Sequence, residues 1–289
     1  MTEIDAMTYN PYRPHLLRIA AARDETPDVR TLDLRFVDAD AAASFPAWKP
    51  GQFGEYTVFG AGECVFALAN APAREPGGTP AIKCTYRAIG KVTTALRNLD
   101  VGQVIGFRGP YGNAFPLEQW RGRDLAFVGG GIGMAALRAA LLSVLDQRSE
   151  FGRVLVLNGA RTAADMVYRE EMPEWEEFDG VRVVRTVDPG GETDGWDGEV
   201  GLIPDVFERE GPAPDGCIVV ACGPPVMLHF LFESLEKMGY SPQQVVTTLE
   251  NKMKCGVGQC GRCNVGSFYV CREGPVISWE QLRKLPADY

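Results

Sequence analysis

The spacing of apolar residues divides the chain near residue 120. Upstream, six short apolar runs are separated by turn residues such as Pro50-Gly51 and Pro76-Gly77-Gly78, a pattern typical of strands in a small antiparallel barrel. The predicted strands are 15–22, 29–37, 51–59, 64–70, 81–89 and 104–109. Residues 90–99 differ, because their composition predicts a helix that opens with a glycine and caps the barrel. The first turn of such a helix offers free backbone amides, which suit a diphosphate.

Downstream of residue 120, strand-like and helix-like runs alternate. The predicted strands are 124–129, 153–159, 181–187, 217–223 and 244–250. The predicted helices are 132–147, 162–172, 203–209 and 225–238. Alternation of this kind predicts a doubly wound parallel sheet. We therefore expect an antiparallel barrel followed by an α/β domain, with the boundary between Pro116 and Arg123.

Composition and charge narrow the class of protein. A chain of 289 residues, 45% of them apolar, can bury two moderate cores and carry a small appendage. The amino end has acidic residues from Glu3 onward, and no apolar run in the chain approaches the length that spans a bilayer. We therefore expect no targeting segment, no membrane span and a cytoplasmic location. The net charge of −9 argues against nucleic acid as a partner.

A glycine-rich turn follows the first strand of the second half. The segment "VGGGIGMAA" (128–136) runs from an apolar strand into an apolar helix, so Gly131, Gly133 and Ala136 match the G-x-G-x-x-A arrangement. Small residues at these positions let a pyrophosphate approach the start of the helix. A tight turn without a ligand is the alternative, and the strand–turn–helix context favours a nucleotide site.

Two further positions follow predicted strands of the same sheet. Arg161 stands where an acidic residue would mark ribose recognition, so it either pairs with a 2′-phosphate or lies solvated, and the choice between NAD and NADP stays open. Cys222 and Gly223 end the strand 217–223 at the edge where open parallel sheets bind ligands. The alternative for Cys222 is a small buried apolar residue.

Four of the eight cysteines lie in one glycine-rich segment, "KCGVGQCGRCNVGSFYVC" (254–271). Cys255, Cys260 and Cys263 follow the C-x4-C-x2-C spacing of plant-type [2Fe-2S] ferredoxins, and Cys271 can supply a fourth thiolate. Structural zinc sites more often use two C-x2-C pairs, and disulfides are disfavoured in a reducing compartment. The spacing therefore predicts a [2Fe-2S] cluster, with a zinc site, disulfides or free thiols as the alternatives.

Taken in order, these motifs resemble the ferredoxin-NADP reductase superfamily, and within it the flavin subunits of multi-subunit enzymes. The chain is most similar to the gamma (diaphorase) subunits of cytoplasmic nickel–iron hydrogenases and sulfhydrogenases. The electron-transfer subunit of dihydroorotate dehydrogenase and the B subunit of anaerobic sulfite reductase are related. The matching landmarks are "PGQF" (50–53), "IGKVTTAL" (89–96), "RGPYGNAFP" (108–116), "VGGGIGMA" (128–135), "ACGPPVM" (221–227) and "LENKMKCGVGQCGRCNVGSFYVCREGP" (249–275).

This resemblance implies an FAD-binding barrel (1–118), an NAD(P)-binding domain (119–250) and a [2Fe-2S] lobe (251–289). It implies that the FAD diphosphate is held by Gly90, Lys91, Val92 and Thr93. It implies that the nucleotide is framed by Gly130, Gly131, Gly133, Gly223 and Pro224, with Cys222 facing the nicotinamide.

One segment departs from the family pattern. Where the superfamily carries R-x-Y-S at the flavin, this chain has Cys64-Val65-Phe66-Ala67, without the arginine that pairs with phosphate or the serine hydroxyl near the ring. Phe66 can still stack on the isoalloxazine beside Ala67, and Leu68 to Asn70 keep backbone groups for its edge. The phosphate can then rest on the helix start.

These parts indicate a protein that links two-electron to one-electron transfer. A nicotinamide exchanges a hydride, a [2Fe-2S] cluster carries one electron, and a flavin can do both. No acid–base or nucleophilic motif for a second small substrate is evident, so we expect an electron-transfer subunit that serves a partner metalloenzyme subunit with further clusters. The alternatives are a nucleotide-sensing binding module with a zinc-stapled tail and a stand-alone reductase that feeds an oxygenase.

Overall fold

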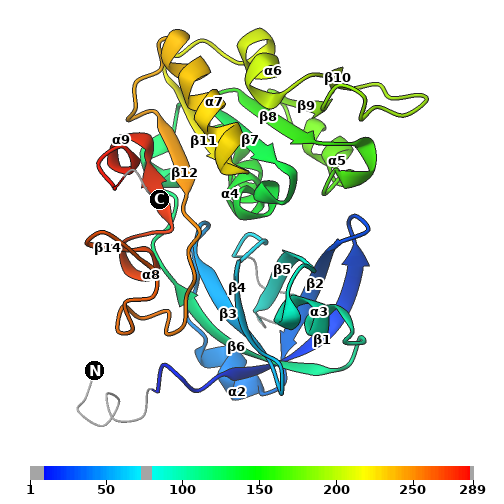
Figure 1. Cartoon of the computed structure of the whole chain (residues 1–289), viewed down its shortest axis with the longest axis vertical. Helices are drawn as coiled ribbons and strands as arrows, with labels where there is room; N and C mark the ends of the chain where they lie inside the picture. Colours follow the sequence, from blue (N-terminus) through cyan, green and yellow to red (C-terminus); the bar gives the residue numbers. More distant parts are fainter. Residues whose placement is uncertain (1–9, 73–79, 287–289) are drawn as a thin grey trace.

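A computed structural model describes residues 10–72 and 80–286, and it places a barrel at one end and an α/β domain at the other (Figure 1). The barrel sheet has the order β4-β3-β6-β1-β2-β5, and every neighbouring pair is antiparallel. Its strands are β1 (His15–Asp24), β2 (Val29–Phe36), β3 (Phe53–Val58), β4 (Gly62–Ala67), β5 (Ala81–Arg87) and β6 (Val104–Tyr111). The predicted antiparallel barrel is confirmed, while the predicted turn Pro76-Gly77-Gly78 lies outside the described residues.

Apolar side chains at alternate positions of the strands fill the interior of the barrel. Leu32 and Leu34 of β2 and Ile82 and Cys84 of β5 are fully buried, because every second residue of a strand points to the same side. Helix α3 (Lys91–Arg97) caps this core with Leu96, as predicted for 90–99. A second short helix, α2 (Ala39–Ser44), lies between β2 and β3.

The second sheet has the order β10-β9-β8-β7-β11-β12-β15 and is parallel except for β15. Its strands are β7 (Asp124–Gly130), β8 (Val154–Ala160), β9 (Val181–Val187), β10 (Glu199–Val200), β11 (Cys217–Cys222), β12 (Val245–Thr248) and β15 (Val276–Ser278). The turns η1 (Leu117–Trp120), η2 (Gly131–Gly133), η3 (Arg148–Glu150) and η4 (Ala163–Asp165) are 3-10 helices. The predicted doubly wound parallel sheet is confirmed.

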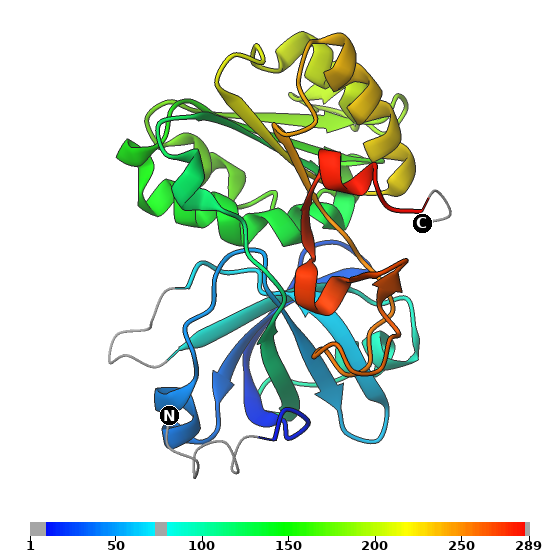
Figure 2. The same ribbon diagram turned by 90° about the vertical axis from the view of Figure 1, so that its left-hand side faces the viewer.

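Helices cover both faces of this sheet (Figure 2). Along β7, Leu125 and Phe127 pack with α4 (Met134–Asp146) and α5 (Met172–Glu176) on one face. Ala126 and Val128 pack on the other face, with α6 (Ile203–Glu210) and α7 (Pro225–Lys237). Both faces are buried, which explains why the strands are apolar throughout rather than alternating.

The cysteine segment leaves the α/β sheet after β12, runs down along the barrel and returns as β15, which pairs antiparallel with β12 (Figure 1). It contains a hairpin of two short strands, β13 (Asn264–Val265) and β14 (Phe268–Tyr269), and then the helix α8 (Val270–Glu273). A last helix, α9 (Trp279–Leu282), follows β15. Val265 and Val270 of the segment share a small core with Phe53 and Tyr111 of the barrel. The segment therefore packs against the barrel and joins the sheet of the α/β domain at its end.

One predicted helix is wrong. Residues 162–172 form a 3-10 turn, η4, and an irregular stretch, and α5 begins only at Met172, with Pro173 in its first turn. Tyr168 has φ of +57°, a left-handed conformation that interrupts a helix. Separately, none of the helices that the structure describes has the length and apolar composition needed to cross a membrane.

Candidate functional site

Two turns meet at the carboxyl edge of the parallel sheet. One follows β7 and contains Gly131 and Gly133, and the other follows β11 and contains Gly223 and Pro224. A side chain on Gly133 would overlap the backbone carbonyl of Cys222, so glycine is required for the two turns to touch. The structure thus brings together the residues predicted to frame a nucleotide.

The outer side of the first turn is open. Gly131 has φ of +55°, and no heavy atom lies within 4 Å of a Cβ built on it. A Cβ built on Gly130, in contrast, would overlap Met227 and lie 3.2 Å from Pro224. The protein closes one side of the turn and leaves the other free, so the site fits a pyrophosphate that approaches the start of α4.

Cys222 is an almost fully buried thiol at this edge. Its Sγ accepts a hydrogen bond of 3.2 Å from the Thr248 hydroxyl of β12. Burial raises the pKa of Cys222 to about 12, and the Thr248 hydrogen bond opposes this shift only in part. The thiol therefore stays neutral at physiological pH and offers contact surface rather than a nucleophile.

Arg161 follows β8 at the same edge and is exposed. Within residues 10–72 and 80–286 its guanidinium forms no ion pair, so it is available to an anionic group. This geometry agrees with either alternative for Arg161, a 2′-phosphate contact or a solvated side chain.

The start of α3 offers the second candidate anion site. The amides of Lys91, Val92 and Thr93 donate no hydrogen bond within the described part of the chain. The Gly90 amide donates to the Thr93 hydroxyl at 2.8 Å, which braces the turn. Lys91 is exposed and adds a positive charge beside the free amides. These groups fit the diphosphate of a dinucleotide.

The altered flavin segment lies on β4, next to α3. Burial raises the pKa of Cys64 to about 12, so this thiol supplies no charge in place of the missing arginine. The half-buried Phe66 ring stacks on Tyr86, with centroids 5.4 Å apart and an interplanar angle of 30°. The Asn70 side chain is engaged by the backbone of β5, through Ala81 at 2.9 Å and Lys83 at 2.9 Å. The Asn70 side chain thus ties the segment after β4 to β5 and has few groups left for a ligand.

The cysteines of the segment lie near one another. Cys255 has Cys260 as a neighbour, and Cys271 has both Cys263 and Cys255. Burial, with the neighbouring Cys263 thiol, raises the pKa of Cys271 to about 12. In the part of the chain that the structure describes, no group of three or more His, Cys, Asp or Glu side chains is already arranged to hold a metal ion.

Backbone amides point at two of these sulfur atoms. Gln259 and Cys260 donate to Cys255 Sγ at 3.3 and 3.4 Å, and Gly258 donates to Cys271 Sγ at 3.1 Å. Burial opposes ionisation of Cys255, but backbone hydrogen bonds outweigh it and lower its pKa to about 7. Amide donors of this kind stabilise thiolates, so the loop fits the cysteine ligands of an iron–sulfur cluster.

A buried arginine fixes this loop to the barrel. Arg108 of β6 is 3% exposed and donates to the carbonyl oxygens of Lys254 and Cys255, both at 3.2 Å. It also pairs with Glu55 of β3 and, at 3.0 Å, with Glu63 of β4. Burial raises the pKa of Glu55 to about 7, although Arg108 acts in the opposite direction. We refer to Arg108, Glu55, Glu63 and the two carbonyls as the loop anchor.

Sequence reasoning missed the loop anchor, although a signal was present. Arg108 interrupts the apolar run "VIGFRG", and Glu55 interrupts "GQFGEYTVF". A charge inside an apolar strand indicates a buried partner, because an unpaired buried charge is very costly. The same signal occurs at Arg138 in the apolar helix "MAALRAALLSVLD".

Two family models match the chain. The model described as "Oxidoreductase NAD-binding domain" matches residues 127–232. The model described as "Iron-sulfur cluster binding domain of dihydroorotate dehydrogenase B" matches residues 250–283. The first covers both turns at the carboxyl edge of the sheet, and the second covers all four cysteines of the loop.

Solved structures confirm the fold. A structure titled as an NADH-dependent reduced ferredoxin-NADP oxidoreductase, studied for flavin-based electron bifurcation, superposes with a TM-score of 0.71 at 22% identity and covers 94% of this chain and 90% of its own. The Amycolatopsis cytochrome P450 reductase GcoB superposes with a TM-score of 0.67 at 25% identity, covering 81% of this chain and 68% of its own.

Whole-chain relatives define the family. The chain is 33% identical to "Sulfhydrogenase 1 subunit gamma" of Pyrococcus furiosus, over 96% of this chain and 94% of the relative. It is also 33% identical to the "Probable dihydroorotate dehydrogenase B (NAD(+)), electron transfer subunit" of Thermoplasma acidophilum, over 93% and 91%. With this identity over nearly the whole of each chain, the protein belongs to the oxidoreductase family of sulfhydrogenase gamma subunits and dihydroorotate dehydrogenase B electron-transfer subunits.

Proposed function

We propose that this chain is the electron-transfer (diaphorase) subunit of a multi-subunit oxidoreductase, moving electrons between NAD(P)H, FAD and a [2Fe-2S] cluster. FAD lies on the start of α3 and on the segment from Phe66 to Asn70. The nucleotide lies on the two turns at the carboxyl edge of the sheet, beside Cys222 and Arg161. The cluster is held by Cys255, Cys260, Cys263 and Cys271.

The arrangement of the cysteine loop carries this proposal. Its four cysteines lie near one another at the ferredoxin-type spacing, with backbone amides aimed at the sulfur atoms of Cys255 and Cys271. The match of residues 250–283 to an iron–sulfur cluster binding domain favours the cluster over a zinc-stapled tail.

When bound, FAD exchanges a hydride with the nicotinamide and single electrons with the cluster. The residues of this chain align and shield these groups. The open face of Gly131 seats the pyrophosphate, and the neutral, buried Cys222 forms an uncharged wall at the nicotinamide. The loop anchor holds the backbone of Lys254 and Cys255 on the barrel, so a cluster on these cysteines would be fixed to the domain that would carry the flavin.

The partner in this proposal is a metalloenzyme subunit of the same complex, located in the cytoplasm. Support comes from the relatives, which are named as a gamma subunit and as an electron-transfer subunit of larger enzymes. The proposal covers both NAD and NADP as the nucleotide.

The experiment is anaerobic purification with metal and flavin analysis. We expect one flavin and about two irons per chain, together with NAD(P)H-dependent dye reduction. Cys263→Ser should lose iron but keep the flavin and its reduction by nucleotide. Cys217→Ser, at a buried cysteine of β11 outside the loop, is the matched control and should keep its iron. One zinc per chain with no iron would replace this proposal by the binding-module alternative.

A further inference from the structure

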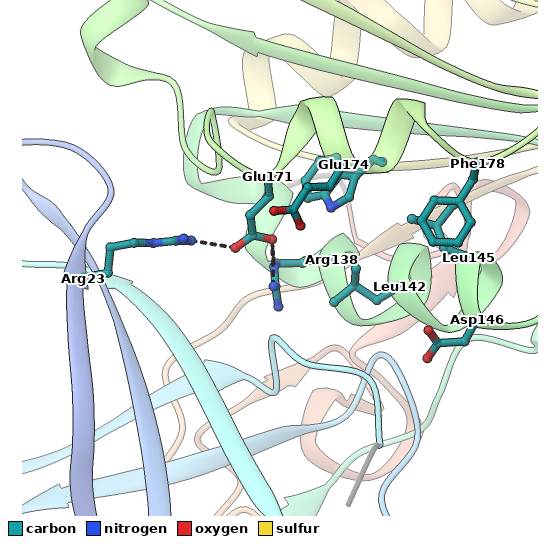
Figure 3. Close-up of a pocket in the computed structure, with 9 residues that line it drawn as sticks. Arg23, Arg138, Leu142, Leu145, Asp146, Glu171, Glu174 and Phe178 are labelled. Atoms are coloured by element: carbon teal, nitrogen blue, oxygen red, sulfur yellow. Dashed lines mark hydrogen bonds and ion pairs between the residues drawn. The ribbon is translucent and has the colours of Figure 1, made fainter. Parts of the chain in front are cut away.

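The barrel and the α/β domain meet at a cavity of about 360 Å³ between β1 and the helices α4 and α5 (Figure 3). One wall is apolar and includes Leu142 and Trp175. At the end nearest the barrel, Glu171 points between two arginines, Arg23 of β1 and Arg138 of α4 (Figure 3). Polar bonds beside this cavity join the two domains, next to apolar packing in which Val29 of β2 belongs to the core of the α/β domain.

Glu171 and Arg138 form a buried ion pair, and each also forms a hydrogen bond with a residue of the barrel. Glu171 Oε2 pairs with Arg138 at 2.7 Å, while Glu171 Oε1 accepts from Arg23 at 2.6 Å. Arg138 Nη1 donates to the carbonyl oxygen of Ala69 at 2.6 Å. The pair therefore crosses the domain boundary twice, at β1 and at the segment after β4.

Tyr168 provides a third crossing beside the pair. Its hydroxyl donates to Thr85 Oγ1 of β5 at 2.6 Å, and its amide donates to Glu25 at 3.2 Å. The Arg138 guanidinium lies 5.1 Å from the centre of its ring. Tyr168 holds a left-handed backbone conformation, which a non-glycine residue keeps only where its surroundings fix it. We call Glu171, Arg138, Arg23 and Tyr168 the domain clamp.

The domain clamp joins the two segments assigned to the reacting cofactors. Ala69, which accepts from Arg138, belongs to the segment proposed to line the flavin edge. Arg138 lies five residues after Gly133, on the helix whose start is proposed to hold the nucleotide. Hydride transfer needs the reacting atoms about 3–3.5 Å apart, and a misplacement of about 1 Å can cost about 100-fold in rate. Small changes in how the domains meet should therefore alter the rate of hydride transfer.

We propose that Glu171 is a positioning residue that, through Arg23 and Arg138, sets the nucleotide domain against the barrel so that nicotinamide and flavin meet at reacting distance. This inference rests on the proposed function. Glu171 touches neither cofactor in this proposal, and it acts through the position of α4 relative to the segment around Ala69.

The test is anaerobic stopped-flow reduction of the flavin by NADH, or by NADPH if that is the faster donor, in the whole chain with its cofactors. In Glu171→Gln we expect the limiting rate of flavin reduction to fall at least tenfold. The nucleotide Kd, read from the concentration dependence, should change less than threefold, and flavin and iron content should stay unchanged. Glu199→Gln removes an exposed pair with Arg209 inside the α/β domain and should behave as the unchanged chain.

Arg23→Gln covers the case in which Glu171→Gln does not fold. Arg23 is partly exposed on the barrel, and the buried Glu25 with which it also pairs keeps hydrogen bonds from Thr31 and Tyr168, so the variant should fold while the Glu171 crossing is broken. Its limiting rate should fall by about threefold or more at unchanged nucleotide Kd. A lower melting temperature with an unchanged limiting rate in both variants would show a merely structural role and overturn the inference. Absence of flavin reduction in the unmodified chain would instead overturn the proposed function.

Discussion

Two arginine networks join the barrel to the rest of the chain. The domain clamp joins it to the α/β domain, and the loop anchor joins it to the cysteine loop. The domain clamp joins Arg138 of α4 and Glu171, the residue before α5, to Arg23 of β1. The loop anchor links a strand side chain, Arg108, to backbone carbonyls of the cysteine loop. Loss of a contact between two domains leaves the backbone hydrogen bonds of each domain intact. The cysteine loop has few regular backbone hydrogen bonds, so loss of its contact with the barrel should disorder the loop itself.

Charge separates the two networks as well. The loop anchor places one arginine between Glu55 and Glu63, while the domain clamp places Glu171 between two arginines, of which Arg23 also pairs with Glu25. Loss of Arg108 leaves the buried Glu55 without its cation. Loss of Arg23 leaves Glu171 still paired with Arg138 and removes the cation beside Glu25. We expect damage to the anchor to affect cluster binding and stability, and damage to the clamp to affect flavin reduction.

The largest effect is expected for Arg108→Gln. Breaking a buried pair from one side costs about 3–5 kcal/mol, because Glu55 keeps its burial and loses its partner. We expect a lower melting temperature and less than half of the iron content, measured by thermal unfolding and metal analysis. The double variant Glu55→Gln with Arg108→Gln should recover part of the melting temperature, since both charges are gone. Full iron content and an unchanged melting temperature in the single variant would contradict the anchor.

Gly256→Ala tests the packing of the loop on the barrel. Gly256 has φ of +69°, and a Cβ there would lie 2.6 Å from the Tyr111 ring and 3.0 Å from Glu55. Gly261 has the same φ of +69° but no heavy atom within 4 Å, so Gly261→Ala is the matched control. We expect the control to lose about 1–2 kcal/mol from backbone strain alone and Gly256→Ala to lose more. Equal melting temperatures and equal iron content in the two variants would show that the contact with Tyr111 is unimportant.

A smaller effect is expected for Tyr168→Phe in the domain clamp. The variant loses the hydrogen bond to Thr85, which keeps its second partner, Thr31, at 2.8 Å. One such bond contributes about 1 kcal/mol, so the melting temperature should fall by a few degrees with iron content unchanged. A loss of iron in this variant would mean that the two networks are not separate.

The smallest effect concerns pH and lies outside both networks. His15 of β1 packs edge-on against Phe36 and Phe45, and burial, followed by the nearby Arg13, lowers its pKa below the usual 6.5. Its neutral form is favoured in the fold, so its contribution to stability is present above pH 6.5 and is lost as the pH falls through the lowered pKa. The difference in melting temperature between the unmodified chain and His15→Gln should therefore shrink between pH 7.5 and pH 5.5. A difference that grows over this range would contradict the burial argument.

The sequence was sufficient for the parts whose signals are local. The two-residue and helical periods predicted the barrel and the parallel sheet, and glycine and cysteine spacing predicted the turn at Gly131 and the loop at Cys255–Cys271. The strand β15 was not predicted. It has only three residues, which is too few for a periodic pattern, and its partner β12 lies some thirty positions earlier. The assignment of individual residues to FAD, nucleotide and cluster stays a prediction.

The contacts between domains could not be predicted from local patterns. Arg23 and Glu171 are 148 residues apart, and neither stands in a recognisable motif. The predicted helix at 162–172 was wrong for the same reason, since Tyr168 takes a left-handed backbone to reach the barrel rather than continuing a helix. Local propensity favoured the helix, and a long-range contact decided the structure.

The most direct test of electron transfer through the cysteine loop is an anaerobic titration with NADH, or with NADPH if it is the faster donor. Electron paramagnetic resonance should follow the cluster, and visible absorbance should follow the flavin. Nucleotide alone should bleach the flavin and raise the signal of a reduced [2Fe-2S] cluster toward one spin per chain. In Cys263→Ser the flavin should bleach without such a signal. A flavin that bleaches with no cluster signal in the unmodified chain, despite two irons being bound, would contradict the account.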